Sequence, residues 1–466
     1  MPDLNPNSLV VVASPCRSEL GTVSSAQVYG VALVGAMLLL AGAAYGLSFR
    51  MSPTWRPTVF RGVSLVWLTG LCALVALTLA FPGRRATIER LNRVGAWSCL
   101  AQLGLTAFFN LPTQLAMATL TLGALVAWVL ARRFGAGSVM LGAAAAGMAG
   151  FAASLMLIGM ERADMLPFIG HAIDVFVAGG DPYAADFSSI TPNPFFYPPV
   201  QWLIFLPLRV AGLDMRFLNL VCAAGLILLV ELQVLRRKVA LRAGIYPVLL
   251  SPLAFPMMHS GQVWPYWLAI AAFGLLVMRR RWALAALVVA VAVGMRQTAL
   301  VPAAAVFVVV LMQERLLISG RAAMVGVAMM VAIVVPTMLL SDRAISLIFV
   351  DGPRLAQTLA HQAGNPLDQI ALSNWLGWLG LERWDTPVEV VIALATIVLT
   401  TVAARRGTGH MLAMAGAGYA LTVSANSYVH RYYYVAGLLL FVIGFLDDAA
   451  PAESQRWRQT KVDDTA

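Results

Sequence analysis

The stretch that decides the fold runs from Glu161-Arg162-Ala163-Asp164 through Gly179-Gly180-Asp181-Pro182-Tyr183 to Phe196-Tyr197-Pro198-Pro199. It mixes carboxylates, a histidine, paired glycines and prolines, and long apolar runs lie on both sides of it. Connections between neighbouring elements are mostly short, so a polar interval of almost forty residues indicates a functional loop.

The composition around this loop is that of a membrane protein. Hydrophobic residues make up 60% of the chain and charged residues 12%, and the mean hydropathy is +0.79. This excludes an ordinary soluble enzyme and predicts an all-α polytopic membrane protein. The net charge of +10 comes from short arginine clusters between apolar runs. Such clusters orient membrane spans by the positive-inside rule, and they do not indicate a nucleic-acid partner.

About 20 apolar residues cross the hydrocarbon core of a bilayer, and this length predicts about fourteen spans. The predicted spans are 26–48, 62–82, 97–111, 113–131, 138–160, 214–235, 243–259, 264–279, 282–298, 299–317, 321–340, 386–404, 410–425 and 432–447. A second long polar interval covers 341–385, and residues 448–466 are expected to form a disordered cytoplasmic tail.

The basic clusters set the orientation of these spans. Clusters such as Arg132-Arg133 and Arg279-Arg280-Arg281 are expected on the cytoplasmic side, which places both long loops on the outer face. Exceptions are Arg50, Arg56 and Arg61, which the predicted orientation places on the outer face. Residues 197–212 are apolar but too short to cross, and they predict an interfacial helix on the outer face.

The loop after the 138–160 span offers the first candidate for chemistry. Asp164 stands next to a predicted helix over 165–177 and would be its N-cap. His171 is seven residues on, near the same helical face. A capping aspartate followed by solvated polar residues explains this spacing equally well. Gly179 to Tyr183 by itself predicts only a turn, and Tyr197-Pro198-Pro199 by itself predicts an aromatic anchor at the membrane interface.

Taken in order, these motifs resemble glycosyltransferase family 87. The matching features are an aspartate after a span, then Gly-Gly-Asp-Pro-Tyr, then Tyr-Pro-Pro opening an apolar helix. Further matches are Gly261-Gln262, Met295-Arg296-Gln297-Thr298, Asn374-Trp375 and the 424–432 segment. The resemblance covers about 139–447. One departure is Phe168, where such enzymes often carry tyrosine, which puts in doubt any contact that this hydroxyl would make.

The resemblance implies a GT-C-like bundle of transmembrane helices, with a catalytic loop on the outer face and interfacial helices. It divides the chain into a polar N-terminal segment (1–25), an additional module of about four spans (26–137), the glycosyltransferase domain (138–447) and the tail (448–466). It also implies transfer of a hexose, mannose above all, from a polyprenyl-phosphate sugar to an acceptor hydroxyl with inversion. The partners would be membrane lipid, this lipid-linked donor and a glycan or glycolipid acceptor.

By the same resemblance Asp164 would be the general base. Arg296 would hold the lipid phosphate, because a charge near the end of a span is costly without a partner. A snorkelling arginine at the interface is the ordinary alternative. The other residues expected to contact substrate are His171, Asp181, Tyr183, Tyr197, Gln262, His361, Asn374, His430 and Arg431. No ligand spacing indicates a metal.

Three other functions fit parts of the pattern. A transporter or flippase of lipid-linked or small substrates would carry ionisable residues near the middle of its spans, and such residues are scarce here. A glycan polymerase or ligase would share the polar outer loops. A non-catalytic scaffold would tolerate asparagine in place of Asp164. We expect the enzyme in a bacterial cytoplasmic membrane, with its active site on the outer face.

Overall fold

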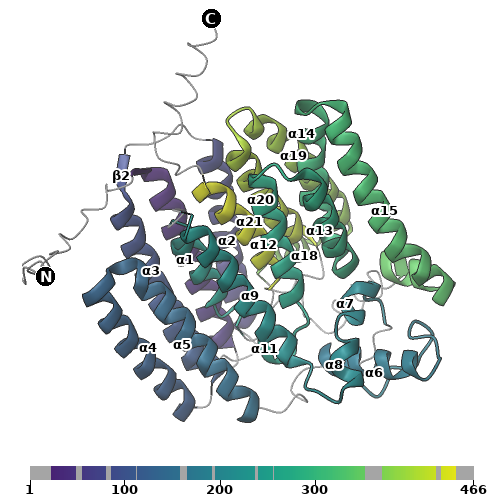
Figure 1. Ribbon diagram of the computed structural model, residues 1–466, viewed down its shortest axis with the longest axis horizontal. Helices are drawn as coiled ribbons and strands as arrows, with labels where there is room; N and C mark the ends of the chain where they lie inside the picture. Colours follow the sequence, from purple (N-terminus) through teal and green to yellow (C-terminus); the bar gives the residue numbers. More distant parts are fainter. Residues whose placement is uncertain are drawn as a thin grey trace, which may run out of the picture.

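The computed structural model describes residues 22–48, 55–79, 85–111, 113–157, 165–190, 195–236, 240–255, 257–351, 370–426 and 432–447. Within these ranges the chain is a helical bundle (Figure 1) with one small antiparallel sheet, in which β1 (Thr22–Ser24) pairs with β2 (Arg85–Thr87). The two strands bring together the beginnings of α1 and α3, the helices that follow them.

Six helices of the described ranges are each long and apolar enough to cross a membrane. They are α1 (Ser25–Ser48), α2 (Arg56–Leu79), α5 (Ala136–Leu157), α9 (Arg216–Val234), α15 (Leu316–Leu340) and α19 (Asp385–Ala404). This confirms an all-α membrane protein. The total of about fourteen crossings stays a prediction.

The remaining long elements fall largely within the predicted spans. They are α3 (Ile88–Asn110), α4 (Thr113–Phe134), α10 (Ala240–Leu249), α12 (Trp264–Met278), α13 (Trp282–Met295), α14 (Leu300–Gln313), α20 (Thr408–Ala425) and α21 (Tyr433–Asp447). The prediction for 97–111 began too late, because Thr87 caps α3 by accepting a hydrogen bond from the Arg90 N–H at 3.2 Å. The prediction for 243–259 was too long, because α10 stops at Leu249 and a short α11 (Met257–Ser260) follows a turn.

Small residues allow the central helices to approach closely. A Cβ atom added at Gly416 of α20 would lie 2.4 Å from the Phe441 nitrogen and 2.6 Å from the Gly437 carbonyl oxygen of α21. Such distances exclude any side chain larger than glycine without movement of the backbone. Helix α21 also packs against α10 and α12, so its first residues have a fixed position in the bundle.

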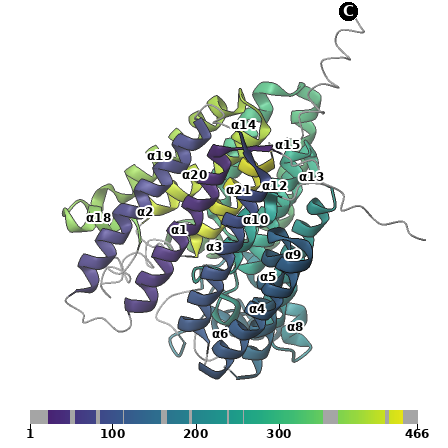
Figure 2. The same ribbon diagram turned by 90° about the vertical axis from the view of Figure 1, so that its left-hand side faces the viewer.

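One end of the bundle is covered by short helices from the long polar loop. These are α6 (Met165–Val177), α7 (Pro199–Leu203) and α8 (Leu206–Val210), and both views place α6 and α8 at the same end (Figures 1 and 2). Helix α6 confirms the helix predicted over 165–177. The single interfacial helix predicted over 197–212 is instead two helices of five residues each. Pro207, which has no N–H to donate, lies in the first turn of α8.

Candidate functional site

Arg296 lies where α13 ends and the chain turns back. Its backbone is extended, with φ −150° and ψ 121°, so it stops α13 and leads into the short 3₁₀ helix η2 (Gln297–Ala299). Pro302 follows in the first turn of α14, where its missing N–H costs no helical hydrogen bond. The sequence therefore places a single arginine at the turn between α13 and α14, called here the α13–α14 hairpin.

The side chain of Arg296 points into the protein and is only 7% exposed. Its guanidinium carbon lies 4.6 Å from the ring centre of Tyr433 and 5.3 Å from that of Tyr432. Its Nε and Nη2 groups have no hydrogen-bond acceptor among the described residues. Burying a cation costs several kcal/mol unless charged or hydrogen-bonding partners compensate. Aromatic faces supply only part of this compensation, so the geometry fits an anionic ligand.

Hydrogen bonds fix the α13–α14 hairpin on the neighbouring elements. Gln297 donates from Nε2 to the carbonyl oxygen of Ile348 at 2.9 Å. The hydroxyls of Thr298 and Tyr419 lie 3.0 Å apart, and that of Tyr419 lies 3.2 Å from the hydroxyl of Tyr266. These bonds join the hairpin to α20 and α12, so Arg296 is held on a rigid frame.

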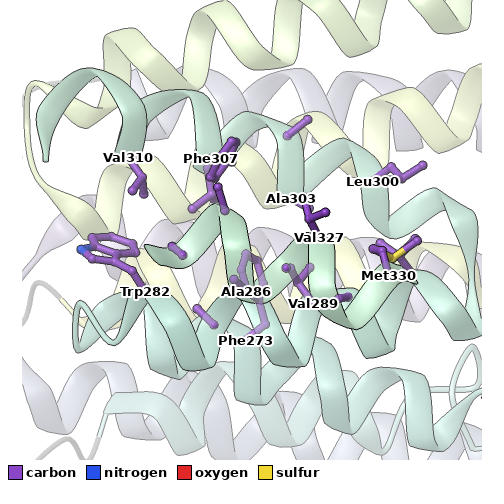
Figure 3. Close-up of a pocket in the computed structure, with 18 of the residues that line it drawn as sticks. Phe273, Trp282, Ala286, Val289, Leu300, Ala303, Phe307, Val310, Val327 and Met330 are labelled. Atoms are coloured by element: carbon purple, nitrogen blue, oxygen red, sulfur yellow. The ribbon is translucent and has the colours of Figure 1, made fainter. Parts of the chain in front are cut away.

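A large apolar cavity lies between α12, α13, α14 and α15. Its volume is about 550 Å³, and its lining includes Phe273, Ala286, Phe307 and Met330. Figure 3 shows these side chains turned toward one space, with Trp282 and Val310 at one end and Leu300 and Met330 at the other. Its aliphatic and aromatic walls suit a hydrocarbon chain.

The cavity runs along α15, most of which is not buried in the bundle. Only four residues of this helix are buried, Ser319 and Ala322 on one side and Ile333 and Thr337 on the other. Between them Gly326 lines the cavity without a side chain, and a Cβ atom there would be in van der Waals contact with the Ala286 Cβ at 3.7 Å. A long apolar ligand could enter from the membrane beside this helix.

One end of the cavity adjoins the Arg296 hairpin. Val293 and Leu300, which flank Arg296 in the sequence, both line it. A second, smaller cavity adjoins Val293 and is closed by Pro198 and Pro199 at the start of α7 and by Ile333 of α15. The turn that carries the buried Arg296 thus adjoins an apolar cavity, although Arg296 itself is not among the residues that line it.

The Gly-Gly-Asp-Pro-Tyr motif forms the turn that its sequence predicts. Gly179 has φ +80°, a conformation that favours glycine. Asp181 accepts a hydrogen bond from the Tyr183 N–H at 2.8 Å, and the Tyr183 hydroxyl donates to the Tyr197 carbonyl at 3.0 Å. Burial raises the pKa of the Tyr183 phenol, which keeps it a neutral donor. In the structure Asp181 and Tyr183 therefore position Tyr197, and direct contact with substrate stays a prediction for both.

Tyr197 has the position that links this motif to Arg296. It packs against Phe168 and Phe195, and its phenol is close enough to Arg296 to interact with it electrostatically. Phe168 itself is buried and packs edge-on against Phe187, so phenylalanine suits this position by filling an apolar centre.

His171 makes contacts within the loop. Its Nε2 lies 3.1 Å from the Asp186 carbonyl oxygen, and its ring packs on Phe187. Asp174, one turn later, accepts hydrogen bonds from Arg209 of α8 at 2.8 and 2.5 Å. That hydrogen-bonded guanidinium lowers the pKa of Asp174. These residues join α6 to α8, and a substrate contact by His171 stays a prediction.

Two further predicted residues, Gln262 and Asn374, are buried. Gln262 is 2% exposed, and neither its Oε1 nor its Nε2 has a hydrogen-bond partner among the described residues. Asn374 lies on α18 (Leu372–Trp378). Gln201 of α7 was not predicted, yet it is buried with both amide atoms unpaired in the described part. The sequence feature that could have indicated Gln201 is that it is a polar residue in the apolar run directly after Tyr197-Pro198-Pro199.

Four predicted site residues lie outside the described residues: Asp164, His361, His430 and Arg431. Their roles stay predictions. The structure does place a sequence neighbour of two of them, since α6 begins directly after Asp164 and Tyr432 follows Arg431. In the described ranges no group of three potential metal ligands is close enough to hold a metal ion.

Comparisons with known proteins give no match, whether to a family model, to a curated protein or to a solved structure. The resemblance to glycosyltransferase family 87 therefore depends on the sequence motifs alone.

Proposed function

We propose that this protein is a membrane glycosyltransferase that moves a hexose, most simply mannose, from a polyprenyl-phosphate sugar to an acceptor hydroxyl on the outer face. The observation that carries the proposal is the buried Arg296, with two unpaired nitrogens, between Val293 and Leu300, which line an apolar cavity of about 550 Å³. A polyprenyl phosphate has the complementary parts, an anionic head and a long hydrocarbon tail.

The geometry of arginine suits the phosphate. Guanidinium presents N–H donors in a planar fork that matches two oxygens of one phosphate. The Nε and Nη2 groups of Arg296, which are the two that lack partners, form one edge of this fork. The rings of Tyr432 and Tyr433 lie 5.3 and 4.6 Å from the guanidinium carbon, while Nε and Nη2 have no hydrogen-bond partner among the described residues.

The proposed reaction is a single displacement at the anomeric carbon. The acceptor oxygen forms a bond to this carbon as the bond to the phosphate oxygen breaks, which inverts the configuration. Asp164 takes the proton of the acceptor hydroxyl, and polyprenyl phosphate leaves with the bonding electron pair. Arg296 would stabilise the negative charge that grows on the departing phosphate.

The test is transfer of radiolabelled mannose from polyprenyl-phosphate mannose in membranes that contain the protein. Wild type and an Arg343→Gln control, which removes an exposed arginine, should transfer equally. Asp164→Asn should lose transfer at unchanged expression, since asparagine cannot accept the proton. Equal transfer by Asp164→Asn and wild type would remove Asp164 from the mechanism, and no transfer by wild type with any lipid-linked sugar would refute the enzyme.

A further inference from the structure

A pair of acidic residues at the start of α19 has no role in the mechanism above. Asp385 is the first residue of this helix, and Glu389 is one turn later on the same face. Asp385 is 1% exposed, and neither of its carboxylate oxygens accepts a hydrogen bond from the described residues. Glu389 is partly buried, and both of its oxygens lie 3.3 Å from Nδ2 of Asn426.

These residues lie at the same end of the bundle as the α13–α14 hairpin. Helices α19 and α20 are antiparallel and meet where a Cβ on Gly418 would lie 2.4 Å from the side chain of Thr396. From this crossing, Glu389 and Asn426 are each about two turns along their helices in the same direction. Tyr419, which bonds Thr298 beside Arg296, lies on α20 about two turns before Asn426.

In the described part of the chain, Nδ2 of Asn426 is the one side-chain donor to this pair of carboxylates, and it serves Glu389 alone. Among the described residues, the charged groups that interact with Asp385 are Glu382 and Glu389, which are also acidic. A buried carboxylate without donors is costly, so a ligand that fits here must donate hydrogen bonds. Phosphate is excluded by its charge. A metal ion would need more ligands than the described residues bring together.

We propose that Asp385 and Glu389 bind the hydroxyl groups of a hexose, each carboxylate accepting hydrogen bonds from neighbouring hydroxyls. The hexose is either the sugar of the donor or a sugar of the acceptor glycan, and this assignment rests on the proposed function. Arg296 then holds the anionic part of the substrate, while α19 and α20 hold a neutral, polyhydroxylated part.

The test is direct binding, which does not need transfer. Purified protein in lipid nanodiscs is mixed with methyl α-mannoside, and saturation-transfer NMR measures which sugar protons receive magnetisation. Asp385→Asn and Glu389→Gln keep the side-chain shape and should each weaken binding about ten- to a hundredfold, the effect of losing one or two bonds to a charged group. Glu382→Gln, a change at an exposed neighbour, should bind as wild type does.

Thermal unfolding of each variant separates lost binding from lost folding, and Glu389→Gln provides a second test if Asp385→Asn is unstable. Unchanged binding in both variants would overturn the proposal, as would binding of glucosamine without binding of the neutral mannoside. The transfer assay then distinguishes the sources. A raised KM for the lipid-linked donor assigns the pair to the donor sugar, and a raised KM for the acceptor assigns it to the acceptor. Normal transfer in both variants without any change in KM would refute the sugar site and leave the transferase standing.

Discussion

Substitution of Arg296 should separate a ligand-binding arginine from a structural one. Its Nε and Nη2 are free to donate two hydrogen bonds to a phosphate, and each bond to a charged group contributes about 1.5–3 kcal/mol. Arg296→Gln should therefore lower kcat/KM by about 10²- to 10⁴-fold, since about 1.4 kcal/mol corresponds to a factor of ten. Arg296→Lys keeps the charge but not the fork, and it should cost about 10- to 10²-fold.

Substitution of Arg296 should lower activity, but it should not lower the stability of the ligand-free protein. The cation–π contacts with Tyr433 and Tyr432, at 4.6 and 5.3 Å, stabilise the folded protein by about 2 kcal/mol. Burial of the guanidinium with unpaired N–H groups destabilises it by several kcal/mol. Arg296→Met should therefore leave the free energy of unfolding within about 1 kcal/mol of wild type, or raise it.

The assay combines steady-state kinetics with thermal unfolding in detergent, with and without added undecaprenyl phosphate. The lipid should raise the unfolding midpoint of wild type, because it binds only the folded state, and it should not raise that of Arg296→Met. An Arg296→Met protein that unfolds at a much lower temperature, together with full activity in Arg296→Lys, would refute the reasoning and make the arginine a structural link between α13 and α21.

Three further predictions address the apolar cavity, the contact between α6 and α8, and the core. Gly326→Leu should fill the space opposite Ala286 and raise the KM for a long polyprenyl donor more than for a short-chain analogue, as initial rates would show. Asp174→Asn should lower stability by about 0.2–1 kcal/mol, the usual contribution of an exposed ion pair. Because Arg209 lowers the pKa of Asp174, this contribution is present above the unfolded pKa of about 4 and is lost as the pH falls through the folded pKa, so the stabilities of wild type and variant should converge in thermal unfolding as the pH falls below the folded pKa. Gly416→Ala should lower stability by about 1–3 kcal/mol through overpacking, as denaturation in detergent would measure.

Each of these predictions has a matched control and a contradicting result. Gly320→Leu, on the same helix but with open space around it, should leave KM unchanged, and an equal effect of both changes would remove the apolar cavity from donor binding. A difference between wild type and Asp174→Asn that persists at low pH would mean that the ion pair is not its cause. Gly62→Ala, where an added Cβ meets nothing within 4 Å, should be harmless. If Gly416→Ala is equally harmless, α20 and α21 are not in tight contact.

The elements with simple sequence signals were predictable. Apolar length alone indicated most helices, and Gly179-Gly180-Asp181 indicated the turn after α6. Helix boundaries that depend on capping or on tertiary contacts were harder to predict from the sequence. The early start of α3 depends on the Thr87 cap, and the end of α10 depends on how the chain packs after Leu249, which hydropathy does not report.

The candidate site was predictable only in part. Arg296 stood out because a lone arginine between apolar runs is costly, and the structure places it in a buried position with unpaired nitrogens. Its contacts with the rings of Tyr432 and Tyr433 could not be predicted, because more than 130 residues separate them in the sequence. Asp385 was missed because an acidic residue at the start of a helix is ordinarily a solvated one that stabilises the helix dipole. Its burial comes from neighbouring helices.

The most direct measurement uses purified protein in proteoliposomes that contain polyprenyl-phosphate mannose labelled in the sugar, together with a soluble mannoside acceptor. The account predicts that label passes to the acceptor with inverted configuration, and that one polyprenyl phosphate is released for each sugar transferred. Label that stays on the lipid while the lipid moves from one leaflet to the other would contradict the account and make the protein a flippase.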